Sequence, residues 1–215
     1  MAMGRSDPMS SALSLMSNLL QLAVGQRVEY EGPAQRTQFT IAATLAALVF
    51  AAIWGLAAGS SSIVLALGNA YKVPMVVLLS ALSAIPAGLL ALRLGAHGSS
   101  ARELLLSFAT SLFAGTLVLA VMSPLVALYY HTSSWAGPYL GMGSAIAALV
   151  VAVVTFARST VVRAPAEMNR GLLAIPLSVT VFVQLAAMLQ FVAMASPILP
   201  ENTVFDSGID RVVGR

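Results

Sequence analysis

The stretch from Leu104 to Tyr129, LLLSFATSLFAGTLVLAVMSPLVALY, decides the fold of this 215-residue chain. It contains no Asp, Glu, Lys, Arg or His. A helix crosses a hydrocarbon core of about 30 Å with roughly 20 apolar residues, so this stretch is long enough to span a membrane. We therefore predict a transmembrane helix here.

Four other uncharged stretches have a similar length. Continuous apolar runs favour helices over the ten-residue alternation of a membrane barrel, and lipid tolerates only these two spanning structures. The predicted fold class is all-α, a polytopic membrane protein whose five transmembrane helices occupy residues 37–197. The expected spans are Phe39 to Ala58, Val73 to Leu92, Leu104 to Tyr129, Pro138 to Ala157 and Leu172 to Ser196.

The composition agrees with a lipid environment. The chain is 59% hydrophobic and 9% charged, whereas an average soluble domain carries roughly 25% charged residues. The net charge of +3 comes from Lys and Arg scattered between apolar segments, so we expect no nucleic-acid partner. Without cysteine the chain has no disulfide framework and no thiolate chemistry.

Proline and glycine mark the predicted helix ends. Pro74 and Pro138 are expected in first turns, where a missing N–H costs nothing. Gly95 and Ser100 flank the predicted break between the second and third spans. Prolines inside or near spans are expected to kink them against neighbouring helices, namely Pro86, Pro124 and Pro176.

The distribution of Lys and Arg predicts the orientation. Eight lie in the arm and the even-numbered connections: Arg5, Arg27, Arg36, Arg93, Arg102, Arg158, Arg163 and Arg170. Three lie on the other side: Lys72, Arg211 and Arg215. The N-terminus is therefore predicted in the cytoplasm, and the 198–215 tail outside. An aromatic belt is expected at that outer interface, formed by Trp54, Tyr71, Tyr129, Tyr130, Trp135 and Tyr139.

The arm, residues 1–36, has no pattern of a cleaved signal peptide. At about 100° per residue, residues 9–24 form an amphipathic helix with Ser10, Ser14, Ser17, Asn18 and Gln21 on one side. We expect this helix to lie in the cytoplasmic leaflet or to dock on the bundle. Curvature sensing is an alternative, because the polar side lacks Lys and Arg.

Ionisable residues, the usual signs of transport, are absent from the predicted span interiors. Lys72, Glu103 and His131 stand only at edges, and His97 and His131 lie on opposite predicted sides. The chain matches no catalytic or nucleotide-binding motif, so we expect no enzyme, cofactor or metal site. Gln184 and Gln190, about 120° out of alignment on a helix, are expected to form hydrogen bonds between helices.

Small residues repeat every fourth position in three spans, which lets helix backbones approach closely in lipid. The predicted packing positions are Ala43, Ala47, Ala51, Gly55 and Gly59 in the first span, and Gly137, Gly141 and Ala145 in the fourth. Ser107, Ser111 and Gly115 repeat likewise in the third. These stripes either seal the bundle or face another subunit.

The entry to the second span, Tyr71-Lys72-Val73-Pro74, with Ala84-Ile85-Pro86 further on, resembles bacterial five-span proteins of the broad Yip1-like type. The resemblance implies a non-enzymatic role in membrane organisation or complex assembly. We expect a scaffold or accessory subunit of the bacterial inner membrane, in contact with the lipid bilayer and with copies of itself or other membrane subunits. The alternative is a small oligomeric transporter or channel.

Overall fold

The computed structural model describes residues 8–26, 32–95, 100–133, 135–165 and 169–195, and these residues are helical apart from short connections. The elements are α1 (Pro8–Ala23), α2 (Pro33–Ala58), α3 (Ile63–Gly95), α4 (Ala101–Thr132), α5 (Ala136–Arg163), the 3₁₀ turn η1 (Arg170–Leu173) and α6 (Ala174–Met194). Five of these are long and apolar enough to cross a membrane. The prediction of an all-α protein with five such helices is confirmed.

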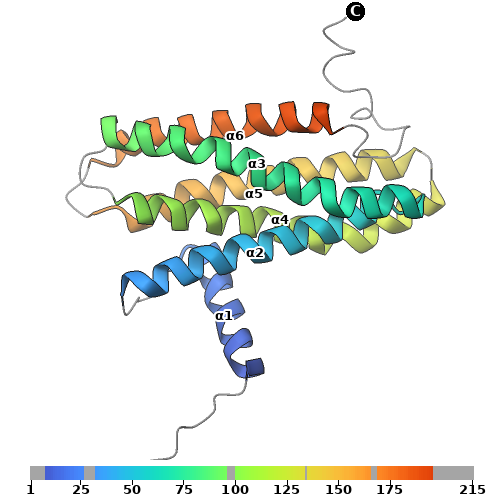
Figure 1. Ribbon diagram of the computed structural model, residues 1–215, viewed down its shortest axis with the longest axis horizontal. Helices are drawn as coiled ribbons and strands as arrows, with labels where there is room; N and C mark the ends of the chain where they lie inside the picture. The colour runs from blue at the N-terminus through green and yellow to red at the C-terminus, as the bar shows by residue number, and fades with distance from the viewer. Residues whose placement is uncertain (1–7, 27–31, 96–99, 134, 166–168, 196–215) are drawn as a thin grey trace, which may run out of the picture.

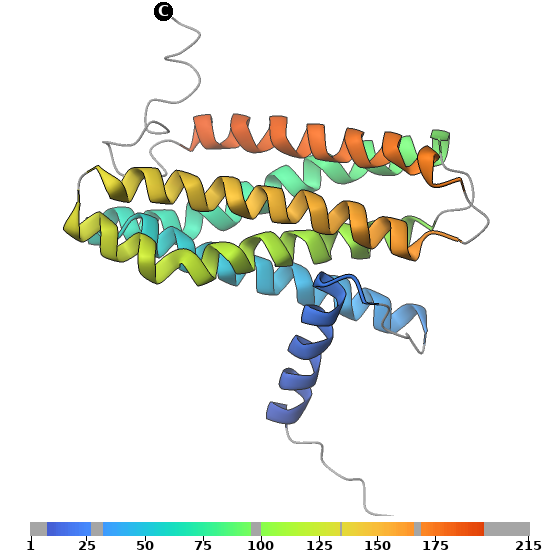
Figure 2. The same ribbon diagram turned by 180° about the vertical axis from the view of Figure 1, so that it is seen from behind.

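The five long helices lie alongside one another, whereas α1 stands at a wide angle to them (Figures 1 and 2). Neighbours follow the order α6, α3, α2, α4, α5. Of the most apolar 18-residue stretch of α4, 67% is buried inside the bundle, whereas the corresponding stretch that includes α6 is only 17% buried. The third predicted span is thus the most buried of the five long helices, and the fifth is the least buried.

The chain direction alternates, so the helix ends gather at two ends of the bundle. We call one the charged end: α2, α4 and α6 begin there and α3 and α5 finish there. At the opposite, aromatic end lie Trp54, Tyr71, Tyr129, Tyr130, Trp135 and Tyr139. The grouping of the aromatic residues follows from antiparallel neighbours of similar length.

Helix α2 has two contrasting faces. Its small residues at every fourth position, from Ala43 to Gly59, are all buried. Large apolar side chains occupy the other face and are exposed: Ile41, Leu45, Val49, Ile53 and Leu56. Small residues inside and large ones outside suit a helix that packs closely against protein and faces lipid elsewhere.

The second span corrects one prediction. Helix α3 begins at Ile63, so Pro74 lies inside it and not in its first turn. Lys72 accordingly belongs to α3 and not to the connection before it. The polar side chains of Asn69 and Lys72 resemble those of a loop, but Asn69 is buried against the neighbouring helix.

Pro138 is the third residue of α5, as predicted for a first turn, and Pro176 is the third of α6. Pro86 and Pro124 lie inside α3 and α4. The tail, residues 198–215, lies outside the described residues, as do Ser196, His97, Arg5 and Arg27.

Candidate functional site

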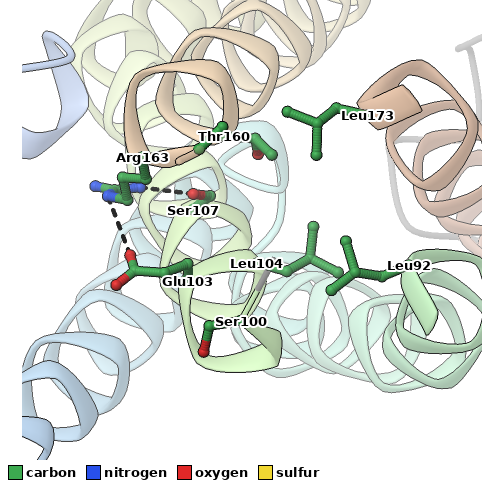
Figure 3. Close-up of a pocket in the computed structure, with 9 residues that line it drawn as sticks. Leu92, Ser100, Glu103, Leu104, Ser107, Thr160, Arg163 and Leu173 are labelled. Carbon is green, nitrogen blue, oxygen red and sulfur yellow. Dashed lines mark hydrogen bonds and ion pairs between the residues drawn. The ribbon is translucent and has the colours of Figure 1, made fainter. Parts of the chain in front are cut away.

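Three charged side chains from three helices meet at the charged end. Glu103 of α4 forms an ion pair with Arg36 of α2, with 2.5 Å between Oε1 and the guanidinium nitrogen. Its Oε2 lies 4.0 Å from Nε of Arg163, the last residue of α5. Arg163 also donates a 2.7 Å hydrogen bond to the hydroxyl of Ser107 (Figure 3). We call these four residues the Glu103 cluster.

Local helix chemistry places the Glu103 cluster. Ser100 is the N-cap of α4, and its hydroxyl accepts a hydrogen bond from the backbone N–H of Arg102 at 3.3 Å. Glu103 therefore falls in the first turn, where the helix dipole favours a carboxylate. Arg163 ends α5, where the dipole favours a cation. The antiparallel arrangement of α4 and α5 brings these two ends together.

Burial gives the Glu103 cluster its energetic weight. The side chains of Arg163 and Glu103 are only 10% and 21% exposed, while that of Arg36 is 37% exposed. Desolvating a guanidinium costs free energy unless a carboxylate and hydrogen-bond acceptors compensate. Glu103 and Ser107 supply that compensation for Arg163, so the cluster ties α2, α4 and α5 to one another.

A small cavity of about 10 Å³ adjoins the cluster, which is room for about one water molecule. Glu103, Ser107 and Arg163 lie on one side of it, and leucines on the other (Figure 3). Thr160 also lines it, and its buried hydroxyl has no hydrogen-bond partner among the described residues. The cavity can hold a bridging water, but its size does not fit an organic substrate.

Polar side chains deeper in the bundle join helices in pairs. The indole N–H of Trp54 in α2 donates to the hydroxyl of Ser144 in α5 at 3.0 Å, and Ser144 in turn donates to the carbonyl of Gly141. The side-chain amide of Gln184 in α6 donates to the hydroxyl of Ser80 in α3 at 2.8 Å. Each pair links helices that are distant in the sequence.

The two predicted intramembrane glutamines have different surroundings. Gln184 is half-buried and bonded to Ser80, whereas Gln190 is exposed. Their different faces follow from the six-residue spacing. The structure therefore does not bring them together in one site.

The predicted small-residue stripes lie at close helix contacts. A Cβ added to Gly59 would come within 2.6 Å of the Ala66 backbone, and one added to Gly55 would clash with the carbonyl of Asn69. Gly137 and Gly141 are buried against Tyr130, and Ala145 is half-buried. In α4, Ser107, Ser111 and Gly115 are buried, with Gly115 against the Ala148 carbonyl of α5.

Sequence reasoning missed the Glu103 cluster and the Trp54–Ser144 bond. The sequence predicts Glu103 only at the edge of a span and Trp54 only in an aromatic belt. A usable signal existed for the cluster, because Arg36, Glu103 and Arg163 stand at helix ends that alternating topology brings to one side. No comparable signal pairs Trp54 with Ser144, since the pairing depends on the relative rotation of α2 and α5.

Within the described ranges, no group of three or more His, Asp or Glu side chains could hold a metal ion. Comparison of the chain with protein-family models, with curated proteins and with solved structures finds no match. The class that the described residues define is that of an all-helical protein with five helices long and apolar enough to span a membrane.

Proposed function

We propose that this chain is a non-enzymatic scaffold or accessory subunit of a membrane protein complex in the bacterial inner membrane. One observation supports this above all: three polar side chains of the long helices form hydrogen bonds to side chains of other helices. Trp54 binds Ser144, Gln184 binds Ser80 and Arg163 binds Ser107. Polar groups used in this way stabilise one arrangement of the bundle, as an assembly component requires.

The outer surface agrees with partners in the plane of the membrane. α5 and α6 are the terminal helices of the packing order, and large apolar side chains on them are exposed, including Ile146 and Val150 on α5 and Phe182 and Leu189 on α6. Lipid, a second copy of the chain or another membrane subunit can cover such a surface. The Yip1-like resemblance points to the same kind of role.

A small oligomeric transporter or channel is the alternative, and Asn69 is the observation that favours it. The side chain is fully buried, yet in the part of the chain that the structure describes neither its amide nitrogen nor its carbonyl oxygen has a hydrogen-bond partner. A buried amide without partners is costly, and it is the kind of group that a permeating solute could use.

The test compares Gln184→Leu, Gln190→Leu and Asn69→Leu with the unmodified protein. If Gln184 serves packing, its replacement costs about 0.6 kcal/mol, the average for hydrogen bonds between spans. We therefore expect each glutamine variant to insert and to co-purify with the same membrane proteins, with Gln190→Leu as the matched control on the exposed face.

Reconstituted vesicles separate the two functions. If the unmodified protein moves an ion or solute, and Gln184→Leu or Asn69→Leu inserts normally but does not, the polar group lies on a permeation path. That result would contradict the scaffold function and support the transporter function. Co-purification of one stable set of membrane proteins, with no flux, supports the scaffold.

A further inference from the structure

The N-terminal helix α1 has three different faces. Leu19 and Leu22 are buried and belong to one hydrophobic cluster with residues of α2 and α4, namely Phe39, Ala43, Leu106, Ala109 and Phe113. Exposed polar residues, including Ser17 and Gln21, form a second face. A third face is an exposed apolar stripe made by Leu13, Met16, Leu20 and Val24, which are between 37% and 68% exposed.

Only one end of α1 rests on the bundle, and the rest projects sideways (Figures 1 and 2). The described helices therefore leave the apolar stripe uncovered. In water, three exposed large apolar side chains on the 16-residue helix, with that of Val24 directly after it, would be unfavourable. The direction of α1, across the axes of the long helices, is the direction of the membrane plane.

The depth of α1 matches the edge of the hydrocarbon layer. α4 has 32 residues and is about 48 Å long at about 1.5 Å per residue. Centred on a hydrocarbon core of about 30 Å, it extends about 9 Å beyond the core at each end. The α4 members of the hydrophobic cluster that also contains Leu19 and Leu22 of α1 run from Leu106 to Phe113, about 8 to 18 Å from the start of α4.

The handedness of α1 orients the two exposed faces. Viewed from the N-terminus, positions of a right-handed helix advance clockwise by about 100° per residue. Clockwise in this view, the polar face comes first, then the docked face of Leu19 and Leu22, and then the apolar stripe. In Figure 2, α1 lies in front of α2 with its N-terminal end pointing away from the bundle. The polar face and the apolar stripe therefore lie on opposite sides of the docked face.

We propose that the stripe of Leu13, Met16, Leu20 and Val24 binds the lipid surface of the leaflet at the charged end, with α1 lying in the interface beside the bundle. Binding comes from apolar insertion, because the polar face carries Ser, Asn and Gln and no basic side chain within the described part of α1. The proposal holds whether the bundle is a scaffold or a transporter.

Single cysteines test this in the full chain, which has no cysteine of its own. Met16→Cys and Leu20→Cys probe the stripe, and their neighbours Ser17→Cys and Gln21→Cys are the matched polar positions. Each variant is labelled with a nitroxide and reconstituted into phosphatidylcholine nanodiscs. Accessibility to oxygen and to a water-soluble nickel complex is then measured by electron paramagnetic resonance.

We expect the oxygen-to-nickel accessibility ratio to be several-fold higher at positions 16 and 20 than at 17 and 21. Adding anionic phosphatidylglycerol should leave that difference unchanged. Equal nickel access at all four positions would place α1 in water and overturn the proposal. Low access to both reagents at positions 16 and 20 would also overturn it, because protein would then cover the stripe.

Discussion

Glu103 is the residue whose single side chain bonds to two helices besides its own. Its carboxylate compensates the positive charges of Arg36 and Arg163. Of the three side chains, that of Arg163 is the least exposed. A charge that loses its counter-ion in a buried place costs far more than a surface ion pair contributes. The effect of a substitution at position 103 therefore depends on what remains around Arg163.

Glu103→Ala should lower the free energy of unfolding by about 1–3 kcal/mol, because among the described residues Arg163 then keeps only Ser107 as a side-chain partner. The value is below that of a fully buried pair because Glu103 is 21% exposed. Arg102→Ala, at an exposed position in the same turn, is the control and should change stability by less than about 0.5 kcal/mol. Thermal unfolding in mild detergent measures both, and equal midpoints would contradict the role given to Glu103.

At the scale of the helix, apolar runs were sufficient to predict five spanning elements, since crossing a membrane needs little more than length and composition. The residues at which the helices begin and end were harder to predict. α3 starts ten residues before the predicted Val73, because Asn69 and Lys72 look polar in sequence while the backbone continues as a helix. Neighbour choice was not predictable, since small residues at every fourth position occur in several spans.

Helix α2 makes the role of small residues testable. Ala47 and Ala51 are 1% and 0% exposed, so leucine at either position adds bulk at a close contact. We expect Ala47→Leu and Ala51→Leu each to cost about 1–3 kcal/mol, by analogy with overpacked cores. Ala147→Leu, on the exposed face of α5, is the matched control and should be close to neutral. If all three variants melt alike in detergent, the Ala47 and Ala51 contacts are not tight packing.

Across the whole bundle, the alternating direction of the helices separates arginines from aromatic residues, the two kinds of residue that interact with membrane surfaces. The arginines of the described loops and helix ends gather at the charged end: Arg36, Arg93, Arg102, Arg158, Arg163 and Arg170. Lys72 is the tenth residue of α3 and so lies nearer the aromatic end. Its move from a connection into a helix leaves the eight-to-three division of Lys and Arg unchanged.

That division predicts the orientation, because positively charged connections are retained in the cytoplasm. Ser61→Cys, in the connection at the aromatic end, should react with a membrane-impermeant maleimide added to intact cells. Ser100→Cys, at the charged end, should react only after the membrane is opened; both side chains are exposed. At the C-terminus, a fused reporter enzyme that functions only outside the cytoplasm should be active, and one that functions only in the cytoplasm should be inactive. Labelling of Ser100→Cys in intact cells, with Ser61→Cys protected, would invert the topology and place α1 in the outer leaflet.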